Sequence, residues 1–149
     1  MKVYFYPHKY LRDRQLDTIR TFDEYEVINR QMFLSKKAEQ VPKNNAVRGV
    51  IKRSWKQKLP LLNIKLRPKK LDEDIIVYLW GGLIFSGKFI LDLDNPYALV
   101  GYNSKALWIW RRVIGVILRS SRCLQIRCIS EACRKGVGIL YGEDAYRKA

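Results

Sequence analysis

The chain has 149 residues, of which 48% are apolar, and its formal net charge is +15 at pH 7. This length suits one folded domain with a real core and excludes two domains of ordinary size. No cleavable secretory signal is visible, and the longest uncharged apolar run, residues 75–87, is too short to span a bilayer as a helix.

The positive charge is concentrated in one segment of the chain. Residues 36–70 contain twelve Lys or Arg and a single acid, Glu39, so they carry +11 of the net charge. A local basic patch of this kind indicates an anionic partner surface, either phospholipid or nucleic acid. The three cysteines lack C-x-x-C spacing and His8 is the sole histidine, so we expect reduced thiols in a cytosolic protein and no metal site.

The first thirty residues predict one βαβ unit. Residues 2–7 are aromatic and β-branched and end at a proline, which is typical of a strand. Residues 10–22 place apolar side chains at helical spacing, and residues 25–29 read as a short second strand.

Residues 31–72 interrupt this alternation, because prolines and dense cations leave room for only one short helix, near residues 46–58. On a helical wheel its apolar residues gather on one side and its cations on the other. A basic amphipathic helix with a tryptophan is typical of an interfacial membrane anchor, although a surface helix packed on its own domain has the same pattern. The residues predicted to bind the membrane are Arg48, Lys52, Arg53, Trp55 and Lys56.

Strands and helices alternate again in the second half of the chain. Apolar runs predict strands at 74–80, 89–93 and 124–129, and helical periodicity predicts helices at 104–122, with Ser104 as the N-cap, and at 131–140. Strands separated by helices imply an α/β fold: a Rossmann-like open parallel sheet with helices on both faces. We therefore expect residues 1–149 to form one such domain, with a basic insertion at about 31–72.

In an open parallel sheet the ligand crevice lies beyond the carboxyl ends of the strands. This rule selects polar and glycine residues that follow four of the predicted strands, and we expect them to face one cleft. The residues selected are His8, Gly81, Gly82, Asp94, Asn95, Tyr97, Ser130 and Glu131.

Several of these residues also have a purely structural interpretation. The pair Gly81 and Gly82 could form a tight turn, and Ser130 could cap a helix with Glu131 in its first turn. Either Asp94 or Asn95 could hydrogen-bond the backbone of a turn before Pro96. Asp92 and Asp94 alternate along a strand, so both should project to the same side.

Residues 89–134 resemble the second half of the acceptor-side domain in glycosyltransferases of family 4, within the GT-B group. The resemblance rests on Asp94-Asn95-Pro96-Tyr97 after one strand and on Ser130-Glu131 after the next. It implies one GT-B half that recognises a polysaccharide or lipid-linked acceptor and lines the cleft near the transferred sugar, where Asp94 is the candidate catalytic residue. In that family a second domain binds the nucleotide sugar, and transfer retains anomeric configuration without an obligatory metal or other cofactor.

The resemblance implies that the C-terminal donor-binding domain is absent from this chain, so we expect the isolated chain to be inactive without a donor-binding domain or partner subunit. We expect it to be peripheral at the cytoplasmic, inner face of a membrane. One alternative is a nucleic-acid-binding module that uses residues 36–70, but no recognition motif is present and acids at 92–94 would repel phosphate. A second alternative is a GT-A-type transferase whose Asp92 and Asp94, as a D-x-D element, hold a divalent cation.

Overall fold

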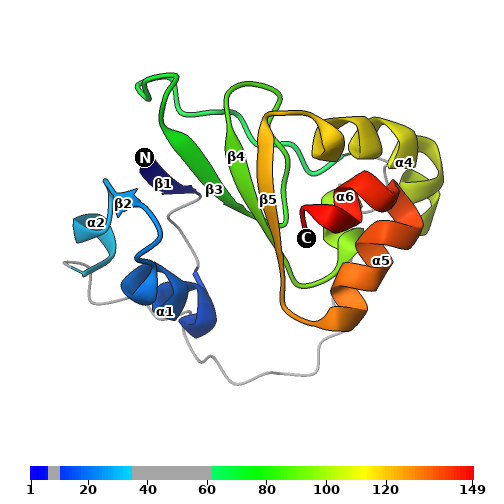
Figure 1. Cartoon of the computed structure of the whole chain (residues 1–149), viewed down its shortest axis with the longest axis horizontal. Coiled ribbons are helices and arrows are strands. Elements are labelled where there is room, and N and C mark those ends of the chain that lie inside the picture. The colour runs from blue at the N-terminus through cyan, green and yellow to red at the C-terminus, as the bar shows by residue number, and fades with distance from the viewer. Residues whose placement is uncertain (7–10, 35–61) are drawn as a thin grey trace, which may run out of the picture.

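A computed structural model describes residues 1–6, 11–34 and 62–149 of the chain (Figure 1). His8 and the predicted membrane-binding residues between 46 and 58 lie outside the described residues. The elements, in chain order, are β1 (Lys2–Tyr6), α1 (Asp13–Thr21), β2 (Glu26–Val27), α2 (Gln31–Leu34), β3 (Ile76–Trp80), β4 (Phe89–Leu93), the 3-10 helix η1 (Pro96–Val100), α4 (Ser104–Arg119), β5 (Cys123–Cys128), α5 (Glu131–Tyr141) and α6 (Glu143–Arg147).

The described strands form one open sheet of five strands in the order β2-β1-β3-β4-β5, and every neighbouring pair is parallel. The register places Val3 opposite Ile76 and Val77 opposite Phe89. This topology confirms the predicted Rossmann-like α/β fold. The strand order reverses between β1 and β3, and open α/β sheets bind ligands at such a reversal.

Helices cover both faces of the sheet, as predicted. On one face α1 packs over side chains of β1, β3 and β4, and on the other face α4, α5 and α6 pack over β3, β4 and β5 (Figure 1). Alternate residues of β3 therefore enter different cores: Tyr78 faces α1, whereas Val77 and Leu79 face α4 and α5. Burial on both faces explains why β3 is a continuous apolar run in the sequence and why β4 is apolar apart from Asp92.

Both ends of the helix predicted at 104–122 differ in the structure. The side chain of Asn103, not Ser104, caps α4, and its Oδ1 accepts hydrogen bonds from the backbone N–H groups of Lys105 (3.0 Å) and Ala106 (3.2 Å). Asparagine and serine are equally good N-cap residues. The sequence alone therefore does not decide which of these two neighbouring residues caps the helix. Helix α4 also ends at Arg119, earlier than the predicted end at residue 122.

The Gly87→Ala substitution should lower the free energy of unfolding by about 2 kcal/mol in chemical denaturation. Gly87 has a φ of +73°, and a Cβ placed there would clash with the guanidinium of Arg67. That guanidinium donates to the carbonyl oxygens of Asp72 (2.7 Å) and Ile75 (2.9 Å), so moving it also breaks these bonds.

Gly101→Ala is the matched control for this substitution. Gly101 has a φ of +59°, but no atom lies within 4 Å of a Cβ placed there. Gly101→Ala should lower the free energy of unfolding by about 1 kcal/mol, through backbone strain alone. If both substitutions lowered the free energy of unfolding equally, the contact of residue 87 with Arg67 would add nothing to the effect of Gly87→Ala.

Candidate functional site

A cleft of about 400 Å³ opens at the carboxyl edge of the sheet, next to β3, which borders the strand-order reversal. Its lining combines the start of α1, the ends of β3 and β4, and the segment that joins η1 to α4. The lining residues are Arg12, Gln15, Asn63, Trp80, Gly81, Asp92, Asp94, Ala98, Gly101 and Tyr102. The cleft is thus where the strand-end rule places a ligand site.

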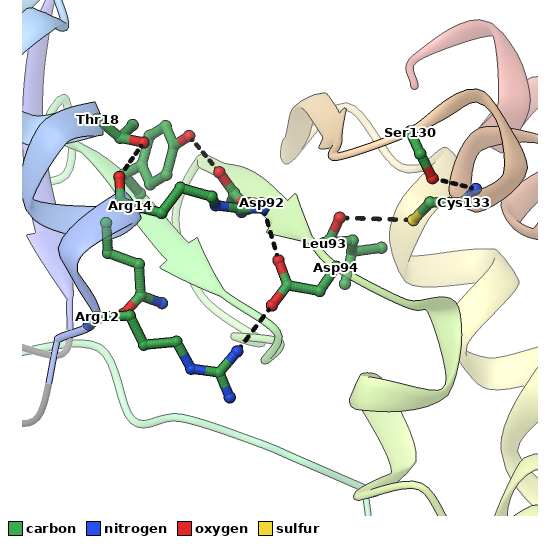
Figure 2. Close-up of polar contacts among 10 residues, drawn as sticks. Arg12, Arg14, Thr18, Asp92, Leu93, Asp94, Ser130 and Cys133 are labelled. Atoms are coloured by element: carbon green, nitrogen blue, oxygen red, sulfur yellow. Dashed lines mark hydrogen bonds and ion pairs between the residues drawn. The ribbon is translucent and has the colours of Figure 1, made fainter.

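Two arginines from the start of α1 bind two carboxylates at the end of β4 (Figure 2). Arg14 bridges both acids: its Nη2 donates to Asp92 Oδ1, and its Nη1 lies 2.8 Å from Asp94 Oδ1. The Nη1 of Arg12 lies 3.3 Å from Asp94 Oδ2. We call Arg12, Arg14, Asp92 and Asp94 the Arg/Asp cluster. Because both acids contact Arg14, the prediction that they project to the same side is confirmed.

The two carboxylates differ in their exposure to solvent. The side chain of Asp92 is 10% exposed, whereas that of Asp94 is 41% exposed. Burial raises the pKa of Asp92 above its usual range, although Arg14 and the hydrogen bond from Tyr78 oppose that rise. The Tyr78 hydroxyl donates to Asp92 Oδ2 at 3.0 Å, and its own pKa is raised by burial, so it stays protonated. Asp92 therefore supports the cluster, and Asp94 is the carboxylate that a ligand can reach.

The paired glycines after β3 serve different purposes. Gly81 lines the cleft and has a φ of +59°, which makes the turn at the strand end. Gly82 is buried and is not among the lining residues, and a Cβ there would lie 3.2 Å from the backbone oxygen of Asn63. The glycine at 82 is explained by close packing, and only Gly81 borders the cleft.

Four further residues predicted to face the cleft are not among its lining residues. Asn95 caps η1, because its Oδ1 accepts from the N–H of Tyr97 at 2.9 Å. Ser130 caps α5 by accepting from the N–H of Cys133 at 3.2 Å, with Glu131 in the first turn. In Figure 2 this cap lies on the other side of the end of β4 from the Arg/Asp cluster. The structural interpretation of Asn95 and Ser130 is therefore confirmed.

The cleft also contains residues that were not selected from the sequence. Arg12 and Arg14 follow β1, so the strand-end rule would have reached them if it had been extended into the next helix. Trp80 is the last residue of a predicted strand, and Tyr102 lies between two elements. Asn63 lies in the irregular basic segment, where no periodic pattern marks it.

The described residues also bear on metal binding, thiol chemistry and membrane spanning. No group of three metal-ligating side chains occurs there, and the arginines already neutralise both acids of the D-x-D element. The three cysteines are free thiols, and burial raises the pKa of Cys123 and Cys128 to about 12, so both stay protonated at neutral pH. No helix among residues 1–6, 11–34 and 62–149 is long and apolar enough to cross a membrane.

The chemical character of the cleft is polar, aromatic and nearly neutral. The Arg/Asp cluster balances two positive charges against two negative ones, and the rings of Trp80 and Tyr102 border it. Carboxylates, guanidinium and amide groups beside aromatic rings can orient a ligand that has both hydroxyl groups and apolar faces. Comparison with known proteins found no matching family model, no matching curated protein and no matching solved structure.

Proposed function

We propose that this chain is the acceptor-side domain of a retaining GT-B glycosyltransferase, and that its cleft binds the sugar of a polysaccharide or lipid-linked acceptor. The observation that supports this most is the Arg/Asp cluster beside Trp80 and Tyr102. Sugar hydroxyls both donate and accept hydrogen bonds, so they match a site that offers carboxylate and guanidinium together. The C–H faces of a sugar ring match the aromatic rings.

In this proposal Asp94 and Arg12 contact the acceptor, while Asp92, Arg14 and Tyr78 hold them in position. Asp94 accepts a hydrogen bond from the attacking hydroxyl, whose oxygen forms the new bond to the anomeric carbon of the donor. The bond from that carbon to the diphosphate breaks, and the hydroxyl proton leaves with the diphosphate. Rigid support from the buried Asp92 matters because small displacements of a catalytic group lower the reaction rate strongly.

The donor nucleotide sugar is bound by another domain or a partner subunit, which stabilises the charge on the leaving diphosphate. The basic segment at 36–70 favours operation at an anionic surface, which suits the cytoplasmic face of a membrane. A lipid-linked acceptor would be presented at that same surface.

A transfer assay tests the proposed division between acceptor and donor domains. The chain is incubated with nucleotide sugars and fluorescent acceptors, first alone and then with each protein that co-purifies with it. We expect no transfer by the chain alone and transfer when a donor-binding partner is added. Transfer or hydrolysis of a nucleotide sugar by the chain alone would contradict the proposal.

Tyr102 gives a prediction in which binding and stability respond differently. It is a non-glycine residue with a φ of +62°, it is 64% exposed, and it lines the cleft. Tyr102→Gly should leave the free energy of unfolding within about 1 kcal/mol of the parent, because relief of strain offsets the greater entropy of the unfolded chain. The same substitution should lower affinity for sugar acceptors by about 5-fold, as loss of an aromatic contact of about 1 kcal/mol implies.

Tyr102→Phe is the control, because it keeps the aromatic ring and removes only the hydroxyl. We expect its affinity to stay close to that of the parent in isothermal titration with the same acceptors. A Tyr102→Gly variant that binds as tightly as the parent would show that the exposed ring has no part in recognition.

A further inference from the structure

Helix α4 presents an exposed face that mixes apolar and basic side chains. Trp108 is 77% exposed, Val116 is 60% exposed, and Ile109 and Val113 are also exposed. Lys105, Arg112 and Arg119 follow one another at seven-residue spacing along the same side of the helix. The α4 face consists of Lys105, Trp108, Ile109, Arg112, Val113, Val116 and Arg119, all exposed. Helix α4 has no acidic residue, so nothing on this helix offsets its cations.

A hollow of about 450 Å³ lies between the second half of α4 and the end of α5. We call it the three-arginine hollow, because Arg111, Arg112 and Arg119 line it together with Val116, Leu140, Tyr141 and Gly142. The Nη1 of Arg119 donates to the carbonyl oxygen of Tyr141 at 3.1 Å, which fixes this guanidinium at the rim. Among the described residues no acid lines the hollow, and Glu143, which follows Gly142, pairs with Arg147 at 3.7 Å. Three guanidinium groups without an acid favour an anionic ligand with phosphate-like oxygens.

The exposed face is not needed for the protein's own core. The opposite side of α4 is buried against the sheet through residues that include Ala106, Leu107, Ile114 and Leu118. In Figure 1, α4 lies on the outer side of the molecule, at the other end from α1 and α2. Tyr102, at the cleft, lies just before the first residue of α4, so this face begins beside the proposed acceptor site.

We infer that the α4 face docks on an anionic lipid membrane, with a lipid phosphate in the three-arginine hollow. An amphipathic helix with Trp and aliphatic side chains on one face and cations among them buries that face at the boundary of headgroups and acyl chains. The long arginine side chains reach back to the phosphates while their stems stay against apolar surface. A second copy of the chain would instead bring cations against cations, which opposes self-association through this face.

This inference rests on the proposed function for its membrane setting, and it adds a surface outside residues 36–70. The α4 face would hold the mouth of the cleft next to the lipid surface on which a lipid-linked acceptor is carried. The two candidate membrane surfaces can be told apart, because their cations lie on separate segments of the sequence.

The test is co-sedimentation of the chain with phosphatidylcholine vesicles, with and without phosphatidylglycerol. The double substitution Arg111→Gln/Arg112→Gln should lower the partition coefficient on anionic vesicles by about 30-fold, from about 1 kcal/mol per basic residue. Lys2→Gln/Lys88→Gln removes the same charge from exposed positions outside both candidate membrane surfaces and should have a smaller effect. A third variant, in which Arg48, Lys52, Arg53 and Lys56 become Gln, tests the contribution of the basic segment at 36–70 to vesicle binding.

Insertion is measured separately by quenching of tryptophan fluorescence with lipids brominated on their acyl chains. We expect quenching on anionic vesicles that is largely lost in Trp108→Phe and kept in Trp55→Phe. The inference is overturned if Arg111→Gln/Arg112→Gln binds like the parent, if its loss of binding merely equals that of the Lys2/Lys88 control, or if quenching persists in Trp108→Phe. Capture of an acidic protein by the α4 face without any vesicle binding would also overturn it.

Further measurements distinguish membrane binding by the α4 face from the proposed acceptor function of the cleft. Thermal unfolding of Arg111→Gln/Arg112→Gln and of Trp108→Phe should match the parent, since these side chains are exposed. Asp94→Asn should keep vesicle binding, whereas Arg111→Gln/Arg112→Gln should keep the affinity for soluble sugar acceptors. Vesicle binding without sugar binding would leave the membrane surface standing and reject the acceptor site.

Discussion

Replacing Arg14 by Met should lower the free energy of unfolding by about 2 kcal/mol at pH 7, because the substitution leaves a buried carboxylate without its ion-pair partner. Asp92 is 8% exposed, and Arg14 is its only cationic partner among the ion pairs of the described residues. The expected loss is smaller than for a fully buried pair, because the Arg14 side chain is 38% exposed and solvent screens it. Chemical denaturation measures the loss directly.

The effect of Arg14→Met should depend on pH. Burial already raises the pKa of Asp92, and removing Arg14 removes the first of the influences that lower it. A carboxyl whose pKa is higher in the folded state than in the unfolded state binds its proton more tightly when folded, so folding gains stability as pH falls through the folded pKa. The deficit of Arg14→Met should therefore be largest at neutral pH and should shrink on acidification.

Two variants control this experiment. Arg20→Met removes an exposed arginine of the same helix, whose partner Asp17 is also exposed, and should change stability by less than about 0.5 kcal/mol. Arg14→Met/Asp92→Asn removes the unpaired charge, so most of the pH dependence should disappear. A deficit in Arg14→Met that stays constant with pH would show that lost packing, not the charge of Asp92, causes it.

Replacing Asp94 by Asn should lower the affinity for sugar acceptors by about 30-fold, which corresponds to about 2 kcal/mol for a hydrogen bond to a charged group. Asn has the same shape but lacks the charge that draws Arg12 and Arg14 to this side of the cleft. Stability should change by less than about 1 kcal/mol, since these pairs are partly exposed. Isothermal titration with soluble acceptors measures the affinity.

Asp17→Asn is the matched control for Asp94→Asn. Asp17 is an exposed acid on α1 that pairs with Arg20 at 3.2 Å and does not line the cleft. Its replacement should leave the affinity unchanged. If both variants lose affinity equally, the effect comes from overall charge and not from the cleft.

The fold could be predicted from the sequence because its signals are local. The run that became β3 is apolar throughout and the run that became β4 is apolar apart from Asp92, since both of their faces are buried. The helices between strands follow the 3.6-residue period. Strand order is not a local property, and the reversal between β1 and β3 appears only in the assembled sheet. Helix ends shifted by a few residues where neighbouring residues cap equally well, as at Asn103 and Ser104.

The candidate site was predicted in part. Gly81 and Asp94 border the cleft because they follow strands directly, which the sequence reveals once the strands are known. The ion pair between Arg14 and Asp92 joins residues 78 positions apart, so no pattern along the chain indicates it. Asn95 and Ser130 follow strands as well, but their side chains bind the backbone of the next helical turn instead of facing the cleft.

A titration of the isotopically labelled chain, followed by two-dimensional NMR, tests directly whether the cleft binds a sugar acceptor. The ligands are neutral oligosaccharides, short-chain lipid-linked sugars, and nucleotide sugars with and without Mn²⁺. We expect acceptors to shift the amide signals of Gly81, Gly101 and Tyr102, and nucleotide sugars alone to leave these signals unchanged. Manganese-dependent binding of a nucleotide sugar at Asp92 and Asp94, with no response to any acceptor, would contradict the proposed function.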